Sequence, residues 1–194
     1  QSASGFESDT FEFDGVKYTV SGLTATAKGT DAGTYEGAVE GTAVVTDPEG
    51  NDVTAQFDVA AQPGELVIAK RDVTLKPADA EKPYDGKPLT ASSFVVTDGS
   101  FAEGEGVESC TYTGSQTLVG KSKSAIGSAT ALAGTNLKDN YNVKYEEGNL
   151  TVTDRAVKYA IEMQAKSGTA TYNGQEQSAS GFESDTFEFD GVKY

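Results

Sequence analysis

The residues that most often carry catalysis are scarce in this sequence, and their scarcity limits the chemistry that it can do. The 194 residues include no histidine, which is the commonest general base and a frequent metal ligand. A Ser-His-Asp or Cys-His site therefore cannot form within the chain. The acidic residues are scattered over predicted turns and polar strand faces, rather than paired as in a glycosidase. We predict that the chain is not an enzyme, with no catalytic, cofactor-binding or metal-binding residue and no cofactor.

One cysteine and one acidic loop are the remaining groups with reactive or ligating side chains. Cys110 has no partner for an internal disulfide, and its alternating apolar surroundings predict a small core residue rather than a reactive thiol. The loop at residues 47–52, Asp-Pro-Glu-Gly-Asn-Asp, offers the oxygen ligands that calcium prefers. The corresponding residues 131–136 carry no carboxylate, so we expect no structural metal ion.

The balance of charge restricts the partners. The chain has 30 Asp and Glu residues against 15 Lys and Arg residues, a net charge of −15 at pH 7. This charge argues against a nucleic-acid backbone or an anionic membrane surface as partner. No stretch approaches the ~20 apolar residues that a membrane helix needs, and the first residues lack a signal-peptide pattern. We predict no nucleic-acid partner and no membrane insertion in this segment.

The sequence is repetitive, and the repeats indicate how the strands of the chain are arranged along it. Residues 1–18 and 177–194 are the same string of 18 residues, which gives a repeat of 176 residues. Phe6, Phe94 and Phe182 occupy the same place in a shorter frame and are 88 residues apart. A period of this size is typical of a tandem array. We predict a repeating unit made of two unlike modules.

The repeat predicts where the modules begin and end. We expect module 1 at residues 1–70, a complete module 2 at 71–153, and the start of the next copy of module 1 at 154–194. Residues 52–68 correspond to 136–152 at an offset of 84. Because module 1 lacks its first strand and its tyrosine turn, the sequence reads as a window cut from something longer. We expect residues 155–178 of another chain, or of a preceding stretch of a longer fibre, to complete it.

Alternation of apolar and polar residues predicts strands throughout. Residues 11–18 alternate around Asp14-Gly15, which predicts two strands and a tight turn. Further strands are expected at residues 57–59 and 157–161, and residues 125–133 allow one turn of helix at most. The fold class that follows is all-β, with tandem antiparallel Ig-like β-sandwich modules arranged end to end. The predicted core of module 2 is Val73, Tyr84, Phe94, Cys110, Tyr112, Tyr141, Val143, Leu150 and Val152.

Several segments together resemble the YDG/MBG-type tandem repeats of bacterial, Gram-positive-like cell-surface proteins. In module 2 they are Tyr-Asp-Gly-Lys-Pro-Leu-Thr at 84–90 and residues 112–120, 140–143 and 148–153. Module 1 is similar through residues 30–35, 52–54 and 64–68. It departs at Asn173 and Glu65, where module 2 has Asp85 and Asn149. The resemblance implies an extracellular, cell-wall-attached protein of many repeats, of the kind described as adhesins. It implies no enzyme and brings no binding residues to these positions.

A covalent crosslink is the one reaction that such a surface protein suggests. Sandwich modules of Gram-positive surface proteins sometimes carry a Lys–Asn bond between the first and last strands. Lys76 and Asn149 are placed for this bond in module 2. Glu65 stands at the asparagine position of module 1, so the crosslink is not expected as a shared feature.

Two functions from different classes fit these observations. The first is a structural stalk of a cell-surface adhesin, which projects other domains from the cell wall and contacts neighbouring repeats head to tail. The alternative is a weak, multivalent binding module for a host glycan or glycoprotein. Glycan binding usually needs exposed aromatic rings, and without tryptophan the nine tyrosines remain. Tyr84 and Tyr172 open turns ahead of strands, and we favour a ring that packs against the next module over an exposed platform.

Overall fold

The chain is nearly all β, as the sequence predicts. The computed structural model describes residues 1–194 and divides them into two compact units. Unit 1 contains residues 1–72 and 136–143, and unit 2 contains residues 73–135 and 144–194. The boundary falls within two strands, β7 (Arg71–Pro77) and β12 (Tyr141–Tyr145). No helix has the length and apolar character needed to cross a bilayer.

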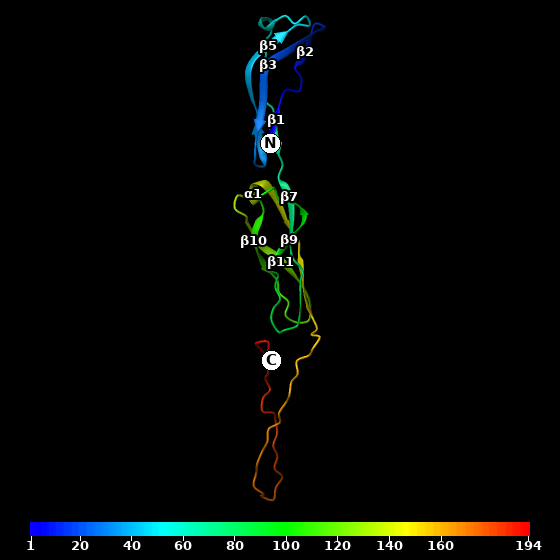
Figure 1. The fold of residues 1–194 in the computed structure, drawn as a ribbon, viewed down its shortest axis with the longest axis vertical. Coiled ribbons are helices and arrows are strands. Elements are labelled where there is room, and N and C mark those ends of the chain that lie inside the picture. The colour runs from blue at the N-terminus through cyan, green and yellow to red at the C-terminus, as the bar shows by residue number, and fades with distance from the viewer. The chain divides into compact units, whose positions relative to one another are not determined.

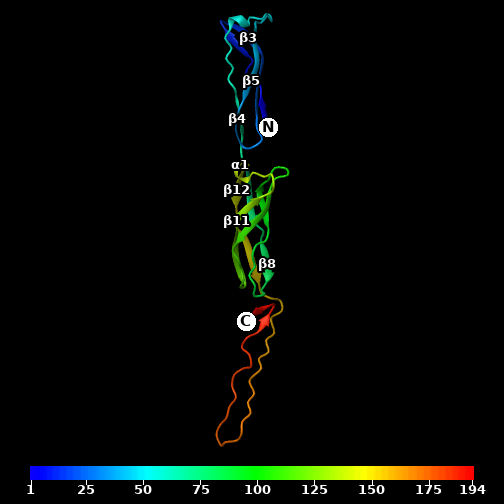
Figure 2. The ribbon, with the colours of Figure 1, turned by 90° about the vertical axis from the view of Figure 1, so that its left-hand side faces the viewer.

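Unit 1 is built on two long antiparallel strands that run side by side in Figures 1 and 2. The four-stranded sheet contains β1 (Ser2–Ser4), β2 (Thr10–Phe13), β3 (Val16–Lys28) and β5 (Ala38–Thr46). A second pair joins β4 (Gly33–Glu36) to β6 (Glu65–Ile68), and a 3-10 turn, η1, covers Thr54–Gln56. The predicted turn at Asp14-Gly15 is confirmed: both residues have positive φ, 48° and 75°, as a two-residue hairpin requires.

The core of unit 1 is thin, and one predicted strand is missing. Within residues 1–72, Ala25, Ala27 and Val45 are the buried apolar residues. The strand predicted at residues 57–59 is wrong, because residues 57–64 have no strand structure. The counterpart of this segment is β12, which pairs with β7, and residues 1–70 contain no counterpart of β7. An extended segment without a partner edge has no ladder of hydrogen bonds to hold it.

Two sheets form the body of the predicted module 2. One has the order β10-β11-β13-β8 and the other β12-β7-β9, with β7 in the centre. The remaining bounds are β8 (Ala80–Pro83), β9 (Phe94–Gly99), β10 (Val107–Thr113), β11 (Gly120–Ala131), the short helix α1 (Leu137–Asn140) and β13 (Gly148–Thr153). The pairs β10–β11, β11–β13 and β7–β9 are antiparallel, whereas β8 and β13 run parallel. Residues 125–133, where one helical turn was allowed, lie mostly in β11 and contain no helix.

The predicted core of module 2 is confirmed. Val73, Leu150, Val152 and Tyr141 are buried, and the other five predicted core residues are half-buried. Gly148 lies close to both sheets: a Cβ atom there would lie 2.6 Å from the Pro77 carbonyl oxygen of β7 and 2.8 Å from the Ser124 hydroxyl of β11. Gly148 therefore lets β13 pack directly against β7.

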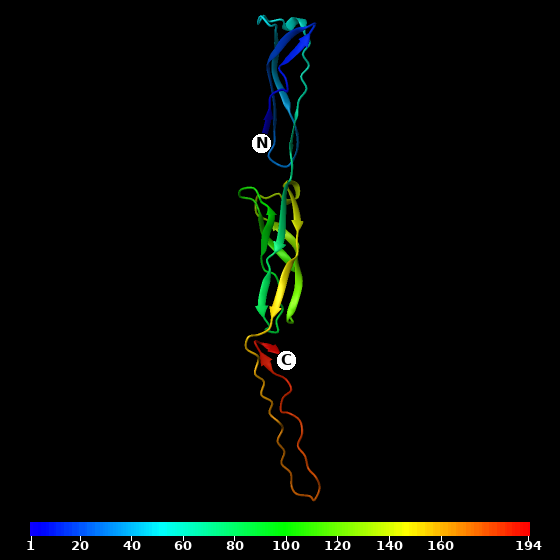
Figure 3. The same ribbon diagram turned by 90° about the vertical axis from the view of Figure 1, so that its right-hand side faces the viewer.

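Residues 154–194 extend outward and return as a long open loop, coloured yellow to red in Figure 3. The loop ends in a hairpin of β14 (Glu188–Phe189) and β15 (Val192–Lys193), whose turn repeats the geometry of Asp14-Gly15. The strand predicted at residues 157–161 is wrong, because this segment pairs with no strand of the chain. The segment alternates apolar and polar residues as a strand does. A strand also needs a neighbouring strand with which its backbone can form hydrogen bonds.

The close approach at Gly148 generates a matched pair of substitutions. We expect Gly148→Ala to destabilise the fold by about 1–3 kcal/mol, because the added methyl overlaps the Pro77 backbone. Gly64→Ala, at the corresponding position of module 1, should be neutral, because no atom lies within 4 Å of its added Cβ. Urea denaturation followed by circular dichroism measures both. Equal midpoints for the two variants would contradict the close packing.

Candidate functional site

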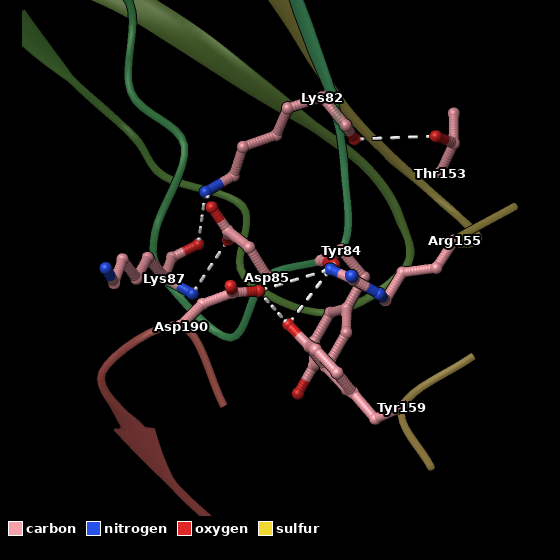
Figure 4. Close-up of polar contacts among 8 residues, drawn as sticks. All are labelled: Lys82, Tyr84, Asp85, Lys87, Thr153, Arg155, Tyr159 and Asp190. Atoms are coloured by element: carbon pink, nitrogen blue, oxygen red, sulfur yellow. Dashed lines mark hydrogen bonds and ion pairs between the residues drawn. The ribbon is translucent and has the colours of Figure 1, made fainter. Parts of the chain in front are cut away.

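The strongest cluster of polar contacts surrounds the tyrosine turn of module 2 (Figure 4). Lys82 donates through Nζ to the Asp85 carboxylate at 2.6 Å and to the Lys87 carbonyl oxygen at 2.8 Å. The Lys87 backbone N–H donates to the same carboxylate at 3.0 Å. Gly86, with φ of 76°, closes the turn between them. These bonds give Asp85, Gly86 and Lys87 each a defined part in the turn.

Arg155 joins this turn to the residues that follow module 2. Its Nη1 donates to the Tyr84 carbonyl oxygen at 2.9 Å and to the Tyr159 hydroxyl at 2.9 Å, and it lies 3.3 Å from the Asp190 carboxylate. The guanidinium carbon is 3.9 Å from the centre of the Tyr159 ring, a cation–π geometry. The Tyr159 hydroxyl in turn donates to the Asp190 carboxylate. One arginine therefore holds three separate segments.

Aromatic rings complete the contact. Tyr159 stacks on Phe189 with ring centroids 4.3 Å apart, and Tyr194 lies 5.9 Å from Tyr159 and 6.4 Å from Tyr84. A Cβ atom at Gly86 would overlap the Tyr194 hydroxyl, so the glycine also makes room for this ring. We call Tyr84, Arg155, Tyr159, Asp190 and Tyr194 the tyrosine-turn cluster.

The electrostatics of the cluster determine which of its groups donate hydrogen bonds and which accept them. The hydrogen bond from Lys82 lowers the pKa of Asp85, so this carboxyl remains an anion that accepts. The bond to Asp190 raises the pKa of Tyr159, and loss of solvent raises the pKa of Tyr194. Both phenols therefore stay protonated as donors. The arrangement can fasten one segment to another.

The cluster gives one 18-residue string two different environments. Phe189 and Asp190 are the repeat counterparts of Phe13 and Asp14 in unit 1. Phe189 is half-buried against Tyr159, whereas 59% of Phe13 is exposed. The repeated string does not by itself explain this difference, because Tyr159, which stacks on Phe189, lies outside it.

The structure settles how the two predicted tyrosine positions lie. Tyr84 is half-buried beside Tyr194, in agreement with a ring that packs against the following segment. Tyr172 is 91% exposed. Arg155 and Tyr159 were not identified as site residues from the sequence. The only available signal was an arginine in the short joint after module 2, and a single arginine in a joint is not specific.

The acidic loop at residues 47–52 uses its carboxylates internally. The Asp47 carboxylate accepts from the backbone N–H groups of Glu49 and Asn51 and from the Asn51 side chain. Asp52 accepts from the backbone N–H and the hydroxyl of Thr54. These bonds lower the pKa of both aspartates. No group of three or more His, Cys, Asp or Glu side chains in the structure is arranged to hold a metal ion.

The structure does not join Lys76 to Asn149. Lys76 Nζ lies 3.1 Å from Asp79, while the Asn149 side-chain oxygen accepts from Lys123 at 2.8 Å. Asp79 also accepts from the backbone and side-chain amides of Asn149, and the backbone bond is the main cause of its lowered pKa. This arrangement is therefore a hydrogen-bonded brace between strands.

Cys110 behaves as the core residue that the sequence predicts. It is half-buried in β10, on the same face as Tyr112. Burial raises the pKa of its thiol, which reduces the fraction of reactive thiolate at neutral pH.

Comparisons with protein-family models, with curated proteins and with solved structures found no match for this chain.

The arginine contacts predict what one substitution does. Arg155→Ala should speed hydrogen exchange of residues 187–194 roughly tenfold, because three hydrogen bonds to a charged donor are lost. Lys158→Ala is the control, since Lys158 is exposed on the same segment. Hydrogen exchange read by mass spectrometry compares the two. Identical exchange in both variants would show that Arg155 does not hold the hairpin.

The raised pKa of Tyr159 predicts a dependence on pH. The docked phenol keeps its proton beyond the ordinary tyrosine pKa of about 10, so docking is stable below that pH and weakens as the pH rises above it. Asp190→Asn should lower the pKa of Tyr159 towards its ordinary value. Titration of tyrosinate absorbance measures this shift. Asp14→Asn, at the repeat counterpart, should leave the titration curve unchanged.

Proposed function

We propose that this chain is a structural repeat, or stalk, of a bacterial cell-surface adhesin, built from Ig-like β-sandwich modules joined head to tail. Such a stalk projects other domains from the cell wall. One observation carries the proposal: a backbone pairing of module 2 recurs between two residues that lie 88 positions further along the chain. In module 2, Pro77 pairs with Phe94, and after module 2, Ala165 pairs with Phe182.

Hydrogen bonds beside these pairs recur at the same offset. The Ala78 N–H donates to the Ser93 carbonyl at 2.9 Å, and the Lys166 N–H donates to the Gly181 carbonyl at 3.0 Å. The repeat is thus a repeat of pairing as well as of sequence. A spacer tolerates duplication and changes in length, whereas a single binding or catalytic site gains nothing from them. The net charge of −15 keeps identical neighbours from associating through their sheet edges.

The alternative function, weak multivalent binding of a host glycan or glycoprotein, draws on one surface of unit 1. Phe11, Phe13, Tyr18 and Phe57 line a hollow of about 650 Å³. The counterpart of Phe13, however, is Phe189, which stacks on Tyr159. The exposed Phe13 ring is therefore better explained as part of a packing surface than as a glycan platform.

Small-angle scattering tests the stalk. We expect each module to add about 40 Å to the maximum dimension, because the 12 residues of β11 span about that length at ~3.3 Å per residue. The measurement compares the 176-residue unit with a tandem duplicate of it. A compact, globular particle would contradict the proposal. A glycan array that gives specific, reproducible hits with the same protein would favour the alternative function instead.

A further inference from the structure

We infer that Asn173 is a site of spontaneous covalent modification, at which the Gly174 nitrogen attacks the asparagine side chain and closes a succinimide ring. The ring then opens in water to aspartate or isoaspartate. Asn173 is the only asparagine of the chain that is followed by glycine. The inference is independent of the proposed stalk, because it depends on hydrogen bonds within residues 171–177.

The reaction consumes water and needs no other molecule. The Gly174 nitrogen loses its proton to solvent and forms a bond with the side-chain carbonyl carbon of Asn173. The bond from that carbon to the amide nitrogen breaks, and the amide nitrogen takes up a proton and leaves as ammonia. Water then adds to one of the two ring carbonyls. Opening at the side-chain carbonyl restores the backbone and leaves aspartate, whereas opening at the backbone carbonyl leaves isoaspartate.

A tight turn holds the two reacting groups together. The Gln175 backbone N–H donates to Asn173 Oδ1 at 3.0 Å. A hydrogen bond from residue i+2 to the side chain of residue i folds that side chain back along the backbone that follows it. Gly174 has a φ of 75°, in the left-handed region that favours glycine, and it has no Cβ atom to hinder the attack. The turn therefore keeps the Asn173 side chain beside the nitrogen that attacks it.

The attacking nitrogen is not engaged elsewhere. The Gly174 N–H donates no hydrogen bond in the structure. The Gly86 N–H, its counterpart in the turn of module 2, donates none either. A bonded N–H would have to break its hydrogen bond before the nitrogen could attack, at a cost in free energy. The reaction at Gly174 has no such cost.

Two donors act on the oxygen that becomes negative during the attack. Besides the Gln175 backbone, Gln177 Nε2 donates to Asn173 Oδ1 at 3.2 Å. The same Nε2 donates to the Thr171 carbonyl oxygen at 2.9 Å, which orients the Gln177 side chain. Charge develops on Oδ1 as the tetrahedral carbon forms, so both donors stabilise the transition state as the donors of an oxyanion hole do. The asparagine is therefore polarised as well as positioned.

Module 2 has the same turn with an acid already in place. Asp85 is the repeat counterpart of Asn173, and its carboxylate accepts from the Lys87 backbone N–H at 3.0 Å. Lys82 also binds that carboxylate, whereas Ala170 stands at the position of this lysine in the next repeat. Conversion of Asn173 to aspartate therefore gives the turn the Tyr-Asp-Gly sequence of module 2, without the lysine that neutralises it there.

Peptide mapping by mass spectrometry tests the site on the full chain, incubated at mildly alkaline pH. We expect a mass gain of about 1 Da in the peptide that carries Asn173, with the aspartate and isoaspartate forms separated by chromatography. Hydroxylamine, which cleaves succinimides, should split the chain between residues 173 and 174. Asn173→Gln is the control and should show neither result, because its longer side chain cannot close the five-membered ring.

Two further variants test the hydrogen bonds. Gln177→Ala should slow the mass gain about threefold, towards the lower end of what one hydrogen bond contributes, since Gln177 is exposed. Gln175→Ala is the matched control and should react at the natural rate, because Gln175 donates through its backbone. Equal rates in the natural chain and in Gln177→Ala would overturn the part assigned to Gln177. A rate at Asn173 no higher than at Asn142, which is exposed and precedes valine, would overturn the site itself.

Discussion

A central β-strand supports both of its neighbours, and much of this structure depends on that constraint. Where β7 is present, β9 and β12 form strands on its two edges, and Val73 and Leu75 are fully buried. Where its counterpart is absent, the equivalent residues 57–61 have no strand structure at all. The missing strand structure of residues 57–61 and the thin core of unit 1 have the same origin, because one strand supplies both the ladder and the apolar side chains.

The local elements of the fold could be predicted from the sequence to a large extent. Alternation identified β10 and β13, the Asp14-Gly15 turn and the core of module 2, because these depend on patterns within a few residues. The two strands that were wrongly predicted, at residues 57–59 and 157–161, have the right composition but lack an available edge. A periodic pattern reports the preference of a segment, while a strand also requires a partner.

The tyrosine-turn cluster shows why a site of this kind is difficult to predict. Asp190 and Tyr159 are 31 residues apart, and their contact depends on a loop that extends outward and returns. The repeated string itself is uninformative, since Phe189 is half-buried whereas the identical residue Phe13 is exposed. What distinguishes the two copies is the neighbour, and the identity of the neighbour is a tertiary property.

The parallel pairing of β8 with β13 has a mechanical consequence. Four residues of β8, near the beginning of module 2, pair with Leu150–Thr153 at its end, and both strands run in the same direction. A pull on the two ends of the module in opposite directions slides one strand along the other, so that the four pairs are loaded together in shear. Antiparallel terminal strands would instead open one bond at a time. A stalk under tension, as proposed above, would depend on this resistance to shear.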